Sequence, residues 1–214
     1  MNRFFLFFLI SFFFSCEKQS YQIGDIFFQD LDCGAPCQAI EAVTSGYQGA
    51  QLSHCAIITS IGTSNYDTIL TEAIGETVTQ TTLHDFLNRS NKVFVGRLKD
   101  EYQYMIPDAI TYIQTDLNGK PYDYIFDITD DTYYCSEIIY EGLKIADSSQ
   151  ELFSLRPMTF NEPGTDMPFV HWVEYYEDLG HPIPEGELGL NPGGMSRSDA
   201  IEIIHIYEKP TGMY

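Results

Sequence analysis

Basic residues are scarce in this 214-residue chain, in which 11 Lys and Arg stand against 31 Asp and Glu and give a formal net charge of −20. A surface this acidic repels phosphate backbones and anionic lipid headgroups, which argues against nucleic-acid binding. The sequence also lacks basic runs, internal repeats and low-complexity tracts, and after residue 15 no apolar run approaches the length that spans a membrane.

Apolar residues, in contrast, are plentiful. The hydrophobic fraction is 44% and the aromatic fraction 14%, so the chain can bury a large core and global disorder is excluded. The length suits one ordinary domain.

The first 16 residues have the pattern of an export signal. Arg3 precedes the apolar run 4–14, which as a helix rises roughly 16 Å, about half of the hydrocarbon core of a bilayer. Ser15 and Cys16 follow, and a small residue before a Cys at this point resembles a bacterial lipoprotein signal. It implies that Cys16 is acylated and becomes the mature N-terminus, with an ordinary cleaved signal peptide as the alternative. We therefore expect an exported protein of the periplasm or outer membrane that touches the membrane only through this anchor.

Boundaries follow from that signal: residues 1–16 as signal peptide, the polar segment 17–22 as tether, and 23–214 as a single domain. Within the domain, periodicity and turn residues predict a mixed α+β fold with an antiparallel sheet packed against helices. The expected strands are 26–29, 53–61, 67–73, 92–98 and 202–207, and the expected helices are 36–45, a short one opened by the capping box at 82–85, 107–118, 134–146 and 168–179.

Four cysteines remain after Cys16. Cys33 and Cys37 are four residues apart at the start of a predicted helix, a spacing that permits a disulfide. Cys55 lies in a predicted strand, where a buried inert thiol is expected. A zinc cluster of Cys33, Cys37, His54 and Cys55 is an alternative, but neighbouring strand residues such as His54 and Cys55 point to opposite faces. We therefore expect no metal and no cofactor.

The fourth, Cys135, begins a predicted helix in TYYCSEIIYEGL. The positive end of the helix dipole favours the thiolate, which is the nucleophilic form. A nucleophilic thiol needs an imidazole as acid and base and a third polar group that orients the imidazole. His54 begins a strong strand, and the hairpin turn at 62–65 places Glu72 of the next strand beside it on the same face. Burial of Glu72 among apolar residues is costly without such a partner.

Five segments follow one another along the chain: GDIFFQ, SHCAIIT, LTEA, KPYDYIFD and YYCSEIIY. In this order they resemble the YiiX/YebB-like permuted papain-fold amidases, which are relatives of the NlpC/P60 cysteine peptidases. In the unpermuted family the helix of the nucleophilic Cys comes first, whereas here the Gly24-Asp25 strand opens the domain and the Cys135 helix follows the His54 strand. The tail segments RPMTFNEPG and IPEGELGLNPGGMSRSDAIEII extend the resemblance over nearly all of the chain after residue 22.

The resemblance implies a circularly permuted papain-like fold with Cys135 as nucleophile, His54 as base and acid, and Glu72 as orienting group. For the oxyanion hole we expect the backbone N–H of Cys135 and one further donor, for which Tyr122 is the candidate. Tyr134 is a further candidate for substrate contact, as an aromatic wall of the pocket.

The expected reaction is acyl transfer through a thioester. Export points to a cell-wall peptide or another envelope amide as substrate. Lipid ester hydrolysis or acyl transfer on the same fold is the first alternative, because permuted relatives include such enzymes. A catalytically silent ligand-binding lipoprotein is the second.

Overall fold

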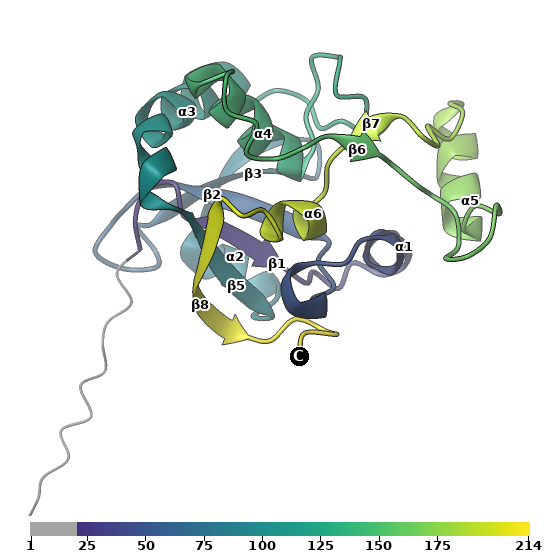
Figure 1. Cartoon of the computed structure of the whole chain (residues 1–214), viewed down its shortest axis with the longest axis horizontal. Helices are drawn as coiled ribbons and strands as arrows, with labels where there is room; N and C mark the ends of the chain where they lie inside the picture. Colours follow the sequence, from purple (N-terminus) through teal and green to yellow (C-terminus); the bar gives the residue numbers. More distant parts are fainter. Residues whose placement is uncertain (1–20) are drawn as a thin grey trace, which may run out of the picture.

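A six-stranded antiparallel sheet in the order β4-β3-β2-β1-β5-β8 forms the centre of the molecule (Figure 1). The structure is a computed structural model that describes residues 21–214. The strands of the sheet are β1 (Ile26–Gln29), β2 (His54–Ser60), β3 (Ile69–Ile74), β4 (Thr77–Thr82), β5 (Val93–Leu98) and β8 (Ile201–Glu208), and β6 (Arg156–Pro157) pairs separately with β7 (Leu188–Gly189). The helices are α1 (Ala35–Val43), α2 (Leu83–Arg89), α3 (Ile106–Tyr112), α4 (Cys135–Ala146), α5 (Val170–Leu179) and α6 (Pro192–Ser196), with short 3₁₀ turns η1 (Tyr47–Gly49) and η2 (Asp100–Met105) and a π turn η3 (Ile113–Leu117).

Strand β1 is buried along its whole length because it pairs with β2 on one side and β5 on the other. Its side chains alternate between two separate cores, as the period of a strand requires. Ile26 and Phe28 belong to the core under α3 and α4, and Phe27 belongs to the core that contains Leu83 and Phe86 of α2. The sheet is therefore covered on both faces.

Helices α3 and α4 pack against each other on one face of the sheet (Figure 1). Gly142 of α4 makes their close approach possible, since a Cβ there would lie only 2.8 Å from the Ile113 side chain that follows α3. This packing fixes the start of α4, where Cys135 lies, over strands β2 and β3.

Helices α1 and α5 contact each other at one end of the molecule (Figure 1). They share a small apolar core of Ala39, Phe160, Trp172 and Tyr176. Cys33 and Cys37, the candidate disulfide pair, are bonded to each other in the structure and stiffen the entry into α1, with Cα atoms 5.4 Å apart.

The predicted α+β class with an antiparallel sheet is confirmed. Strand β1 has the predicted bounds, whereas β4 was not predicted, because its polar sequence TVTQTT lacks an apolar alternation. The predicted helix 107–118 is divided into α3 and η3.

The signal segment 1–16, Cys16 and residues 17–20 lie outside the described residues. Tyr21, which the sequence assigns to the tether, packs on the domain, with its ring 5.4 Å from that of Phe27 and its hydroxyl donating to the Tyr207 hydroxyl at 2.7 Å. Between residues 21 and 214 no helix has the length and apolar character needed to cross a membrane.

Candidate active site

Cys135 is the first residue of α4, and its side chain is buried. The helix begins there because Glu137, three residues after Tyr134, accepts a hydrogen bond from the Tyr134 backbone N–H at 3.2 Å. The first N–H groups of a helix have no partner within it, so the start of α4 presents donors and a positive dipole end beside the thiol. Cys135 and Ser136 both line a cavity.

His54 is the first residue of β2, and its imidazole is held on two sides. Nε2 lies 2.6 Å from Oε2 of Glu72, and the ring stacks on Phe86 with centroids 6.0 Å apart. Because Glu72 occupies Nε2, the other ring nitrogen is the one left to face the thiol of Cys135, with which His54 also hydrogen-bonds. The structure thus brings together the three residues that the sequence selected.

Glu72 of β3 has no exposed surface and is the centre of this arrangement. Besides His54 it accepts two hydrogen bonds from Arg89 Nη2, at 2.8 Å to Oε1 and 2.6 Å to Oε2. Arg89 is the last residue of α2, and its guanidinium lies over the Phe86 ring at 5.1 Å. A buried carboxylate here is therefore neutralised from both sides.

The pKa values of Glu72 and His54 are shifted in opposite directions. Burial alone would raise the pKa of Glu72, but hydrogen bonds and charges from His54 and Arg89 lower it to about 2. Burial alone would lower the pKa of His54, but hydrogen bonds to Cys135 and Glu72 raise it to about 9. The favoured state at neutral pH is therefore an imidazolium between a carboxylate and a thiolate.

The Cys135 thiol has a pKa well below its usual range. A hydrogen bond from Cys55 is the main cause, and the hydrogen bond and charge of His54 add to it against the effect of burial. Burial and the neighbouring Cys135 raise the pKa of the Cys55 thiol well above its usual range, so Cys55 remains protonated and acts as a donor. Sequence reasoning missed this contact because neighbouring residues of a strand, such as His54 and Cys55, point to opposite faces of the sheet. In the structure both residues nevertheless contact Cys135, and His54 is the first residue of β2.

The cavity in front of Cys135 has a volume of about 140 Å³ and mainly apolar walls. Tyr122 and Tyr134, the two tyrosine candidates, both line it, as does Trp172. Burial, followed by the negative charge of Cys135, raises the pKa of Tyr122, so its hydroxyl remains protonated near the sulfur. The Tyr134 hydroxyl accepts a hydrogen bond from the Leu190 N–H at 3.2 Å, which ties it to the cavity wall.

A turn before α4 places Phe126 in that wall. Asp123 accepts hydrogen bonds from the N–H groups of Ile125 and Phe126, both at 2.8 Å, and Phe126 has a left-handed φ of 59°. Its ring contacts those of Tyr134 and Trp172 edge to face, at 5.5 and 6.1 Å.

The alternative zinc cluster does not form in the described structure. Cys33 and Cys37 are bonded to each other, and residues 21–214 contain no group of three or more His, Cys, Asp or Glu side chains placed to hold a metal ion.

Arg89 is a residue of this candidate site that sequence reasoning missed. It lies in a seven-residue helix that the capping box predicts, where a basic residue in the last turn is explained by the helix dipole alone. The signal that points to it is the buried Glu72, which needs more compensation than one imidazole supplies.

Comparison with known proteins shows the family and the fold of the chain. Residues 20–205 match the model of the family described as permuted papain-like amidase enzyme, YaeF/YiiX, C92 family. A crystal structure titled metalloprotein yiiX from Escherichia coli O157:H7, DUF1105, aligns with a TM-score of 0.68 at 23% sequence identity, over 88% of this chain and 98% of that chain. At this identity the likeness concerns the fold. No curated protein matches the chain.

Removing the positive charge of Arg89 tests how much this residue contributes to the stability of the protein. Arg89→Met leaves a buried carboxylate with one partner fewer, so we expect the free energy of unfolding to fall by about 3 kcal/mol. Arg89→Lys should restore part of the loss. Lys144→Met, which removes an exposed pair with Glu141 of the same helix, should cost under about 0.5 kcal/mol. Urea unfolding measures all three, and equal losses for Arg89→Met and Lys144→Met would contradict this role for Arg89.

Proposed function

Because the chain belongs to the permuted papain-like amidase family of YaeF and YiiX, we propose that it cleaves an amide bond with Cys135 as nucleophile, His54 as acid and base, and Glu72 as orienting group. Family membership makes it a cysteine amidase-type hydrolase. The observation that supports the residue assignment is the continuous contact from Arg89 through Glu72 and His54 to Cys135.

In the first half-reaction the Cys135 thiolate attacks the carbonyl carbon of the amide. A C–S bond forms, and the carbonyl oxygen becomes an oxyanion; we assign its stabilisation to the Cys135 N–H and to the Tyr122 hydroxyl, which lines the same cavity. As the C–N bond breaks, the His54 imidazolium gives its proton to the departing nitrogen. The products of this step are a free amine and a thioester on Cys135.

In the second half-reaction water completes the cycle. Neutral His54 takes a proton from water, the resulting hydroxide attacks the thioester carbonyl, and the C–S bond breaks to release the acid and the Cys135 thiolate. Glu72 keeps the imidazole oriented throughout and stabilises its protonated form.

We place this enzyme in the cell envelope, with acylated Cys16 as its anchor and a cell-wall peptide or another envelope amide as substrate. The proposal rests on the apolar run 4–14 followed by Ser15 and Cys16. The second candidate function is lipid ester hydrolysis or acyl transfer, since the aromatic walls Phe126, Phe160 and Trp172 of the cavity also suit an acyl chain.

Alkylation with iodoacetamide tests the ion pair. Because the pKa of Cys135 is lowered and that of His54 is raised to about 9, the wild-type rate at Cys135 should change little between pH 6 and 8. In His54→Ala the thiol pKa returns upward, so the rate should be lower at pH 6 and rise about tenfold for each pH unit. Peptide mapping by mass spectrometry assigns the modified thiol.

The control for this experiment is Cys135→Ala, which keeps Cys55 and should lose the fast labelling. Comparable rates at Cys55 and Cys135, or an unchanged pH profile in His54→Ala, would favour the catalytically silent binding protein.

Substrate class is decided by incubating the full chain with peptidoglycan fragments and, separately, with diacyl lipids. We expect the wild type to cleave amide bonds in the peptide fragments, with products that together gain the mass of one water, and Cys135→Ala to leave them intact. Cleavage of the lipids alone would overturn the amidase assignment in favour of the lipid candidate.

Export is tested separately by supplying an alkyne-tagged fatty acid to cells that make the protein. Wild type should carry the label and fractionate with membranes, whereas Cys16→Ala should carry none. Label retained in Cys16→Ala would exclude Cys16 as the acylation site.

A further inference from the structure

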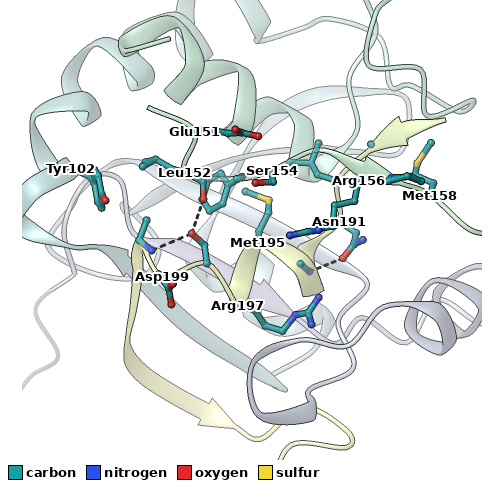
Figure 2. Close-up of a pocket in the computed structure, with 17 residues that line it drawn as sticks. Tyr102, Glu151, Leu152, Ser154, Arg156, Met158, Asn191, Met195, Arg197 and Asp199 are labelled. Carbon is teal, nitrogen blue, oxygen red and sulfur yellow. Dashed lines mark hydrogen bonds between the residues drawn. The ribbon is translucent and has the colours of Figure 1, made fainter. Parts of the chain in front are cut away.

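A second cavity of about 730 Å³ adjoins the one in front of Cys135 (Figure 2). The two share Pro157, Met158, Leu190 and Asn191 in their walls. Leu190 is also tied to the nucleophile helix, because its N–H donates to the Tyr134 hydroxyl and its carbonyl accepts from the Ser136 hydroxyl, both at 3.2 Å. The larger cavity thus lies next to the one in front of Cys135, and the two adjoin along this shared wall.

Two arginines line this larger cavity. Arg156 comes from β6 and Arg197 follows α6, so two separate segments each contribute an arginine to the walls of this cavity. In the view of Figure 2 both lie on the side of the cavity that carries Asn191, away from Tyr102. Within residues 21–214 neither makes an ion pair, whereas the other two arginines of that range, Arg89 and Arg97, bind the buried carboxylates of Glu72 and Asp25.

The unpaired state of these two arginines is informative in a chain with a net charge of −20. Acidic side chains are abundant, and Glu151 and Asp199 line the same cavity, yet neither is within ion-pair distance of Arg156 or Arg197. Elsewhere the acidic surface repels anions, so a negatively charged ligand is favoured where these two cations lie.

We propose that Arg156 and Arg197 bind a carboxylate of the substrate while its scissile carbonyl lies at Cys135. A guanidinium pairs with a carboxylate through two parallel hydrogen bonds. The carboxylates of Glu151 and Asp199 would repel a doubly charged phosphate ester more strongly, which favours a group of single negative charge. The substrate class is therefore a short peptide or acylated amino acid with a free carboxylate. This inference rests on the proposed function and defines its substrate.

Matched electrophiles test the proposal on the full-length protein. The probes are chloroacetyl-glycine, chloroacetyl-diglycine and chloroacetyl-triglycine, each as the free acid and as the C-terminal amide. Acid and amide have the same reactive group and nearly the same size. For at least one length we expect the acid to alkylate Cys135 about 10-fold faster than its amide, since a charge-assisted hydrogen bond at this site corresponds to about a tenfold change.

Variants then assign the preference to the cavity. Arg156→Gln/Arg197→Gln should lose the preference for the acid while keeping the wild-type rate with the amide. Lys144→Gln/Lys209→Gln makes the same change in net charge on exposed side chains outside both cavities and should keep the preference. Thermal unfolding shows whether each variant is folded.

The outcomes separate this inference from the proposed function. Equal rates for acid and amide at every length, or a preference that survives in Arg156→Gln/Arg197→Gln, overturn the carboxylate site and leave Cys135 as nucleophile. Failure of every probe to modify Cys135 overturns the nucleophile assignment, and the inference with it. A preference lost equally in both double variants shows a general charge effect and also overturns the site.

Discussion

The buried carboxylate of Glu72 is the constraint on which the rest of the site depends. A carboxylate without exposed surface is stable only if cations reach it, and two do so, from β2 and from the end of α2. These contacts fix the α2 end, strand β3 and the His54 ring relative to one another. With Nε2 of His54 bound to Glu72 and its ring stacked on Phe86, the other ring nitrogen is left to face Cys135.

Hydrogen bonding and charge, rather than exposure, distinguish the two free thiols within residues 21–214. Cys55 and Cys135 are both buried in the same core, and burial by itself would make both inert. Cys135 differs because it begins a helix, faces His54 and receives a hydrogen bond from Cys55. His54 therefore stabilises the thiolate by its positive charge, and Cys55 stabilises it by donating a hydrogen bond.

Local sequence was sufficient to predict the parts of this site that depend on strand and helix periodicity. The hairpin turn at 62–65 predicted that Glu72 lies beside His54 on the same face, and in the observed register Ile57 faces Thr71, with a bulge before Ser60. Glu72 still shares the face of His54, so the pairing was found. The contacts of Arg89 and Cys55 were not predicted, because they depend on how α2 and α4 pack on the sheet, and local sequence patterns do not contain this information. The larger cavity could not be predicted for the same reason, because apart from Tyr102 its lining residues come from 151–158 and 189–200, where the regular elements β6, β7 and α6 are short.

The proposed catalytic contacts do not depend on the order in which the elements follow one another along the chain. In an antiparallel sheet each strand needs only its neighbours, and β1 lies between β2 and β5 whichever element the chain enters first. A triad is likewise defined by its geometry and not by sequence order. The helix of Cys135 is followed in this chain by β6, α5, β7, α6 and β8, and residues of β6, β7 and α6 line the cavity next to the one that contains Cys135. The proposed catalytic contacts thus come from the sheet and from helices α2 and α4, whereas most of the larger cavity comes from the residues that follow α4. If the larger cavity binds part of the substrate as proposed, substitutions there should change substrate preference while Arg89, Glu72 and His54 stay in place, because the two cavities share only Pro157, Met158, Leu190 and Asn191.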